Sequence, residues 1–343
     1  MIKLFSFLAG KKRAAASSPP RSDRPTVAPS ASSAQVKASS MPSQYDPQLA
    51  ILLAGLCEQT YIQYGNGPPP ANNGKITVPQ GYTQVASFIA PEIPDIELSL
   101  QSSRVHPLSS VDWAQLRSSA ELRARFAAFR DVYFGFALTS ANYNIIALRG
   151  TRTQFEWAID ASLPQVPVPL FWYHHQKFEV ARVHLGFLVL FALLADQVLE
   201  AAKGFNSSLP CLVTGHSLGA ALAVLTSPTV DLLTANKDVR MYNFAGPRVG
   251  DPVFVGAYGE HVAQSYRVVN LTDVVPFLPP TRIFGMDYAH VGEEWSFLNQ
   301  SGNVTDNHGL ISPRNYTAAV NQQVPTNAPR TYPVTGLGNG PAA

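Results

Sequence analysis

The stretch that most constrains this chain is residues 209–221, where an apolar run ends in the pentapeptide Gly215-His216-Ser217-Leu218-Gly219 and an Ala- and Leu-rich run follows. This order predicts a strand, a sharp turn and a helix, with Ser217 at the tip of the turn. Such a turn exposes the serine hydroxyl. It also directs the positive end of a helix toward any oxyanion that forms there.

The pentapeptide alone is weak evidence, because a chain of this length contains Gly-x-Ser-x-Gly by chance roughly one time in ten. A Gly-rich helix start with a capping serine at Ser217 is the alternative interpretation. The decision therefore depends on whether the rest of the chain supplies a base, an acid and a second oxyanion donor.

The composition excludes several classes of protein. Charged residues make up only 14% of the 343 residues, against about 25% in typical proteins, so the chain is mostly buried or carries apolar surface for lipid. A net charge of +2 is too small to indicate a nucleic-acid partner. Two cysteines support no disulfide framework, and we expect no metal and no cofactor. The longest apolar run, Leu185–Leu194, is shorter than the ~18 residues of a membrane span, so we expect no transmembrane segment.

The chain divides into three parts. Residues 1–44 are rich in Ser, Ala and Pro and are typical of a disordered or targeting tail. Residues 45–325 form the predicted folded domain, and residues 326–343 form a flexible tail. Within the domain, periodicity predicts helices at 46–64, 112–130, 180–203, 218–233 and 251–264, and strands at 76–78, 83–89, 132–138, 143–148, 209–213, 239–244 and 266–270. This alternation indicates an α/β fold, with a mostly parallel sheet covered by helices on both faces.

A second oxyanion donor is predicted directly after a strand. The strand at 143–148 ends in Arg149-Gly150-Thr151. Gly-Thr at this place is either an ordinary turn or the loop whose Thr151 amide faces a carbonyl oxygen together with the Leu218 amide.

Residues 154–175 are rich in aromatic and aliphatic side chains, among them Phe155, Trp157, Phe171 and Trp172. Such a segment is unfavourable in water, so it packs as core or forms a lid over an apolar site. Its place beside Thr151 favours the lid.

The acid and the base are predicted from chain order. Asp273 follows a strand, where functional residues of such sheets gather, whereas the rival Asp251 precedes Pro252 and is typical of a helix cap. Of the two later histidines, His290 lies in a strand-like stretch and His308 in a polar loop before a predicted helix. We therefore predict Ser217, Asp273 and His308 as a catalytic triad for two-step acyl transfer.

The chain resembles the class 3 (fungal triacylglycerol lipase-like) lipases of the α/β-hydrolase fold over roughly residues 46–325. The resemblance rests on ordered blocks: 148–151, Trp157 with Asp160, 183–187, 214–221, 244–250, 270–276, 288–290 with Glu294-Trp295, and His308 with Tyr316. It implies the same triad, an oxyanion hole of Thr151 and Leu218, a lid around Trp157 and a non-catalytic His290. The fungal disulfides have no counterpart here.

The sequence thus predicts a lipase that cleaves acyl esters of lipids at an oil or membrane interface. A galactolipid or phospholipid acyl hydrolase, or a soluble-ester (feruloyl-type) esterase of the same fold, is the alternative. A non-catalytic lipid-binding protein is disfavoured by the complete triad. We expect a monomer, at the membrane surface or in the cytoplasm rather than secreted, with organelle targeting left open.

Overall fold

A computed structural model describes residues 37–38, 42–93, 119–151, 163–168, 180–300, 302–310 and 316–324 of the chain. All of them belong to one compact unit, Val36–Ala343. The predicted tails at 1–44 and 326–343 lie almost wholly outside these ranges, and so do residues 112–118 of one predicted helix.

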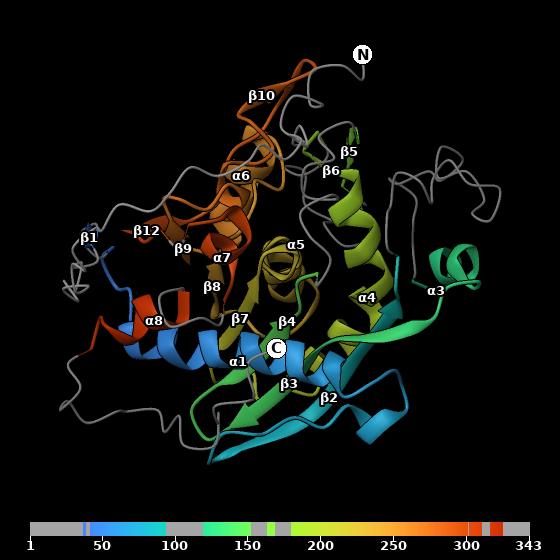
Figure 1. Cartoon of the computed structure of the whole chain (residues 1–343). Helices are drawn as coiled ribbons and strands as arrows, with labels where there is room; N and C mark the ends of the chain where they lie inside the picture. The colour runs from blue at the N-terminus through green and yellow to red at the C-terminus, as the bar shows by residue number, and fades with distance from the viewer. Residues whose placement is uncertain are drawn as a thin grey trace, which may run out of the picture. The chain divides into compact units, whose positions relative to one another are not determined.

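The core of this unit is an eight-stranded sheet with the order β1-β12-β9-β8-β7-β4-β3-β2 (Figure 1). The strands β12, β9, β8, β7 and β4 are mutually parallel. The pairs β1–β12, β2–β3 and β3–β4 are antiparallel. The strands of this sheet are β1 (Lys37–Ala38), β2 (Tyr82–Pro91), β3 (Asp131–Ser140), β4 (Asn144–Leu148), β7 (Cys211–His216), β8 (Val239–Phe244), β9 (Gln264–Asn270) and β12 (Glu293–Leu298).

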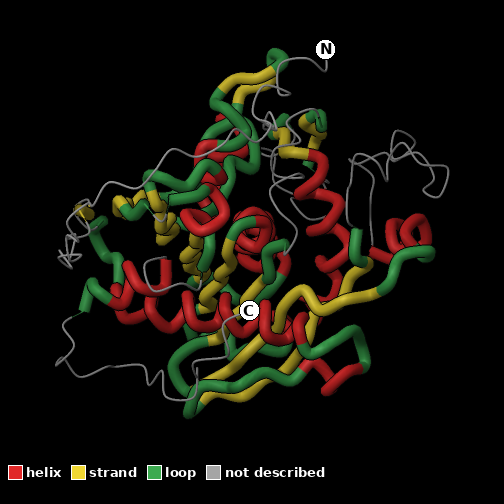
Figure 2. Tube along the Cα trace, viewed as in Figure 1, coloured by secondary structure: helices red, strands yellow, loops and turns green. Residues whose placement is uncertain are grey.

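Helices cover both faces of the sheet (Figure 2). The cluster on one face joins α4 and α5 to inward side chains such as Ile146 and Val213. On the other face α1 and α8 pack on the alternating side chains of the same strands, such as Ile145 and Leu212, as expected for a strand buried on both faces. The helices are α1 (Pro47–Gly65), α3 (Ser119–Arg123), α4 (Leu185–Lys203), α5 (Leu218–Leu233), α6 (Pro252–His261), α7 (Val304–His308) and α8 (Tyr316–Asn321). This is the predicted α/β arrangement, a mostly parallel sheet with helices on both faces.

Short elements lie beside the sheet. The strand β5 (Gln165–Pro167) pairs with β6 (Arg182–His184), and β10 (Arg282–Ile283) pairs with β11 (Met286–Asp287). Single turns of 3-10 helix lie at η1 (Ala71–Gly74), η3 (Ala124–Phe126) and η5 (Val275–Phe277).

Two element predictions were wrong, each for a local reason. Residues 76–78 are not a strand, because side chains of Gln84 and Gln59 bond the amides of Ile76 and Thr77 in place of a strand partner. Residues 180–184 are not helical, because the His184 side chain accepts from the Gly186 amide over 3.2 Å. His184 is thus the N-cap, and α4 begins at Leu185.

The helix α4 is longer than the apolar run on which the membrane prediction rested. It has 19 residues and a mean hydropathy of 1.8, which suffices by length and composition for a membrane span. However, 78% of that window is buried inside the protein, against β2, α3 and α5. Its apolar surface is therefore used as core.

Candidate active site

Ser217 lies at the turn between β7 and α5, in the strained backbone that the pentapeptide predicts. Its φ is 59° and its ψ is −124°, a region that non-glycine residues rarely adopt. A Cβ at Gly215 would lie 2.1 Å from the Gly219 carbonyl oxygen, and a Cβ at Gly219 would lie 2.1 Å from the Leu148 carbonyl oxygen. Both glycines are thus required for the helix to pack this closely on β7 and β4.

His308 and Asp273 complete a hydrogen-bonded chain with Ser217. His308 Nε2 lies 2.8 Å from Ser217 Oγ, and His308 Nδ1 lies 2.8 Å from Asp273 Oδ2. A carboxylate only accepts, so Nδ1 carries the proton and Nε2 is free to accept from the serine hydroxyl. The structure brings together the three residues that sequence order selected.

Asp273 is held by more donors than the sequence suggested. Its Oδ1 accepts from the Val275 amide over 3.0 Å, and its Oδ2 accepts from the Tyr316 hydroxyl over 2.7 Å. Burial and the adjacent Asp273 raise the pKa of Tyr316 well above its usual value, so this hydroxyl keeps its proton. Asp273 is 1% exposed, and these bonds satisfy a carboxylate that has almost no access to water.

The loop that follows β9 is tied to α7 by buried amides. Asn270 Nδ2 donates to the carbonyl oxygens of Asn299 and Asn307, each over 3.0 Å. Asn307 in turn donates to the Thr272 carbonyl over 3.3 Å. These bonds join the segment of Asp273 to the segment of His308, although 35 positions separate the two residues.

His308 was expected in a loop, and instead it ends the short helix α7. The reason is an N-cap: Asn303, whose side chain is typical of this position, accepts from the Asp306 amide over 2.8 Å. His308 is therefore the last residue of a capped, five-residue helix.

The loop after β4 passes close beside the serine. A Cβ at Gly150 would lie 3.1 Å from the Ser217 Cβ and 2.6 Å from the His216 carbonyl oxygen. The buried Arg149 fixes this loop by donating to the Gly150 carbonyl over 2.8 Å, with its guanidinium between the rings of Tyr64 and Phe134. Thr151 follows at once, and Leu218 begins α5, where a helix amide has no acceptor within the helix.

The remaining acid and base candidates have structural roles. Asp251 caps α6 by accepting from the Phe254 amide over 2.7 Å. His290 Nε2 donates to the Pro276 carbonyl over 2.7 Å. Burial, helped by Arg267, lowers the pKa of His290 to about 3, which keeps this histidine neutral.

The predicted lid residues Phe155, Trp157, Phe171 and Trp172 lie outside the described residues. Between them, Leu163 and Val168 are buried in the core. Gln165 of β5 donates to the Asp287 carbonyl over 2.7 Å. The centre of the predicted lid segment 154–175 is thus an anchored strand.

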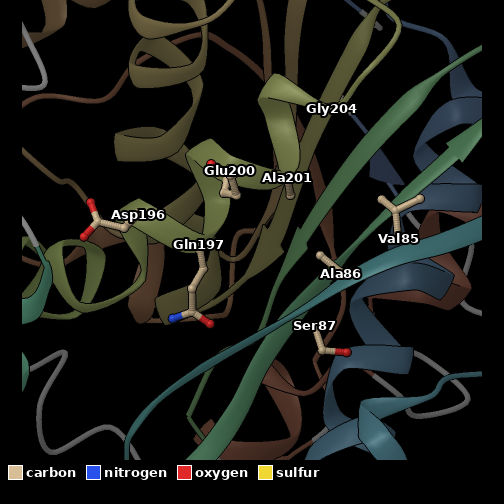
Figure 3. Close-up of a pocket in the computed structure, with 8 residues that line it drawn as sticks. All are labelled: Val85, Ala86, Ser87, Asp196, Gln197, Glu200, Ala201 and Gly204. Atoms are coloured by element: carbon tan, nitrogen blue, oxygen red, sulfur yellow. The ribbon is translucent and has the colours of Figure 1, made fainter.

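A surface hollow of about 680 Å³ lies between β2 and α4 (Figure 3). Its polar residues serve the fold: Gln197 bonds both the amide and the carbonyl of Ile89, and Asp196 accepts from the Ser119 amide. The hollow is lined by Val85, Ala86, Ser87, Asp196, Gln197, Glu200, Ala201 and Gly204.

Within the described part of the chain, no group of three or more His, Cys, Asp or Glu residues could hold a metal ion.

The family model described as Lipase (class 3) matches residues 145–283, from β4 to β10. Residues 145–283 are thus similar to class 3 lipases. The matched segment contains Gly150, the serine turn and Asp273, while His308 lies beyond its end.

Two curated relatives are similar to this chain over part of their own length. A Rhizomucor miehei protein named Lipase is 32% identical over 165 residues, which are 46% of this chain and 42% of that protein. Phospholipase A1-Igamma2, chloroplastic, of Arabidopsis thaliana is 30% identical over 216 residues, which are 48% of this chain and 40% of that protein. The chain spans less than half the length of these relatives.

Among solved structures, the Rhizomucor miehei lipase propeptide complex has a TM-score of 0.48 and 19% identity, over 76% of this chain and 70% of that one.

Proposed function

We propose that this chain is a serine carboxylic-ester hydrolase in which Ser217 is the nucleophile, His308 the general base and Asp273 the acid that orients it. The observation that carries the proposal is the continuous path from Ser217 Oγ through both ring nitrogens of His308 to Asp273 Oδ2, with 2.8 Å at each step. This is the arrangement that activates a serine hydroxyl.

The reaction proceeds in two steps. His308 Nε2 removes the Ser217 proton as Oγ attacks the ester carbonyl, and the imidazolium is stabilised by Asp273. His308 then gives the proton to the departing alcohol, which leaves an acyl ester on Ser217. Water, deprotonated by the same nitrogen, attacks this acyl ester and releases the carboxylic acid and free Ser217.

The negative charge on the tetrahedral oxygen is assigned to two amides, those of Thr151 and Leu218. Leu218 offers the amide at the start of α5, where the helix dipole adds positive potential. Thr151 follows Gly150, whose close approach to Ser217 brings this loop to the serine. A preorganised donor of this kind lowers the activation free energy by about 3 kcal/mol.

A lipid ester at an oil or membrane interface is the proposed substrate. The support is the class 3 lipase segment, the low content of charged residues, and exposed apolar side chains next to the site. Leu271 is 47% and Phe277 47% exposed, both within four residues of Asp273, and Val304 of α7 is 46% exposed. A phospholipid is the second candidate, because relatives named phospholipase A1 are among the matches.

Two experiments test these assignments. Ser217→Ala should abolish hydrolysis of p-nitrophenyl butyrate and labelling by a fluorophosphonate, while the circular-dichroism spectrum stays unchanged. Ser227→Ala on α5, where the hydroxyl donates to the Ala223 carbonyl, is the matched control and should keep activity. Retained turnover in Ser217→Ala would overturn the proposed function.

The second experiment compares hydrolysis of triacylglycerol, galactolipid and phospholipid with that of the soluble ester, below and above the concentration at which an interface forms. A lipid esterase increases its rate at the interface. A rate that saturates on the soluble ester with no increase at the interface indicates the soluble-ester alternative.

A further inference from the structure

A second chain of hydrogen bonds reaches the site from the helix α1. His216, the residue before Ser217, is 4% exposed. Its Nε2 lies 2.9 Å from the His308 carbonyl oxygen, and its Nδ1 lies 2.8 Å from the Tyr61 hydroxyl. The His216 and His308 rings are in tilted contact, with centroids 4.8 Å apart and planes 36° apart.

The partners fix where each proton lies. A carbonyl oxygen only accepts, so His216 Nε2 carries the proton and donates to His308. His216 Nδ1 must then accept, and the Tyr61 hydroxyl donates. Burial lowers the pKa of His216 well below its usual value and raises the pKa of Tyr61, so neither group changes its protonation state near neutral pH.

The accepting carbonyl lies at the end of α7, where helix carbonyls lack acceptor partners within the helix. With only five residues, this helix gives its last residue little rigidity of its own. The His216 bond therefore fixes the backbone from which the His308 imidazole extends.

The same unit contacts the loop on the other side of the serine. A Cβ at Gly150 would lie 2.2 Å from the Tyr61 hydroxyl oxygen, so the phenol packs against the backbone directly before Thr151. Tyr61 and His216 thus contact both loops that the reaction needs.

We propose that Tyr61 and His216 are positioning residues that hold the general base in line with Ser217 through the His308 backbone. This inference rests on the proposed function. Neither side chain contacts the reacting hydroxyl in the bonds described; each acts through His308. We call the hydrogen bonds from Tyr61 through His216 to the His308 carbonyl the relay. A displacement of the base by about 1 Å can lower a rate about 100-fold, so loss of the relay lowers kcat and leaves substrate binding unchanged.

The test uses variants that separate the hydrogen bond from the volume. His216→Met keeps the length of the side chain and removes the donor; we expect kcat on p-nitrophenyl butyrate to fall roughly 10- to 100-fold, with KM within about twofold. His216→Gln restores an N–H at the end of the side chain and should recover most of the loss. Tyr61→Phe removes a single oxygen atom and leaves the bond from His216 to His308 in place. It should therefore lower kcat less, by about threefold to tenfold.

A double variant gives the sharpest readout. Because Tyr61 acts through His216, the variant with both His216→Met and Tyr61→Phe should be no slower than His216→Met alone. The rate at which diethyl p-nitrophenyl phosphate phosphorylates Ser217, with release of p-nitrophenolate, should fall in parallel with kcat. Tyr258→Phe and His261→Met, which remove hydrogen bonds to Ser265 and Asp231, are the matched controls and should keep kcat.

Unchanged kcat in folded His216→Met, equal damage by Gln and Met, or losses that multiply in the double variant would each overturn the relay. If His216→Met does not fold, Tyr61→Phe and His216→Gln decide by the same kcat readout. Ser217→Ala, measured in parallel, separates the proposed function from the positioning role. An inactive Ser217→Ala beside a fully active His216→Met would contradict the positioning role alone.

Discussion

The Tyr316 hydroxyl and the His308 imidazole donate to the same oxygen of Asp273, over 2.7 Å and 2.8 Å. The tyrosine oxygen also accepts from the backbone amide of Asn270 over 3.1 Å. One phenol from α8 therefore links the carboxylate to the end of β9 and fixes its orientation toward His308.

Removing this phenol should weaken both the fold and the reaction. Tyr316→Phe leaves the Asn270 amide without its acceptor and Asp273 with one donor fewer, which costs about 1–3 kcal/mol of the free energy of unfolding. We expect kcat to fall about tenfold, because Asp273 then holds the imidazole less firmly. Urea unfolding and kcat on p-nitrophenyl butyrate measure the two effects, with Tyr258→Phe as control. Unchanged kcat would exclude an orienting role for Tyr316.

The two glycines of the serine turn should tolerate no side chain. Gly215→Ala and Gly219→Ala each place a Cβ 2.1 Å from a backbone oxygen, so we expect little folded protein and no activity. Gly256→Ala in α6 is the matched control, since a Cβ there meets nothing within 4 Å. It should raise the free energy of unfolding by about 0.5–1 kcal/mol, as alanine favours helices. Soluble yield, melting temperature and kcat are the measurements.

His290 should make the protein less stable in acid. Its folded pKa of about 3 lies below the ~6.5 of an unfolded histidine, so between these values only the unfolded state binds this proton. The free energy of unfolding therefore falls by up to about 1.4 kcal/mol for each pH unit below 6.5. The buried His216 adds to the same slope.

The variant His290→Gln retains an N–H for the Pro276 carbonyl and has no proton to gain. Urea unfolding between pH 4 and 7.5 should show a shallower slope than the parent protein. His308→Ala measured beside it should lose activity, whereas His290→Gln should keep it at pH 8. An inactive His290→Gln that is still folded would instead assign the chemistry to His290.

The exposed apolar side chains near Asp273 should matter only at an interface. The variant with both Leu271→Ser and Phe277→Ser should hydrolyse emulsified lipid about tenfold more slowly, since burial of two large side chains in lipid contributes about 1.5–3 kcal/mol each at most. Its kcat on p-nitrophenyl butyrate should stay unchanged. Val85→Ser on the distant edge strand β2, where Val85 is 50% exposed, is the control. Equal losses on both substrates would indicate damage to the site rather than to lipid contact.

Elements with strong local periodicity were predictable. The helix at 46–64 is confirmed by α1, which Asp46 caps by accepting from the Gln48 and Leu49 amides. The strands at 132–138 and 143–148 are confirmed by β3 and β4. The elements that failed, residues 76–78 and 180–184, are set by side-chain hydrogen bonds that apolar alternation does not report.

Ser217 and Asp273 could be selected because they follow strands, and His308 because it comes after both in a polar stretch. Their catalytic roles remain predictions, and the lid residues remain untested by the described part of the chain. Tyr61, His216 and Tyr316 could not be assigned in this way. The contact of Tyr61 with His216 joins residues 155 positions apart, and that of Tyr316 with Asp273 joins residues 43 apart.

Periodicity and glycine spacing act over a few residues, so they sufficed to predict the parallel strands, the covering helices and the serine turn. The side chains that surround this turn come from distant segments and are defined by the packed fold. A hydrogen bond depends on distance and direction between atoms, and these are defined only after α1, β9 and α7 have packed around Ser217.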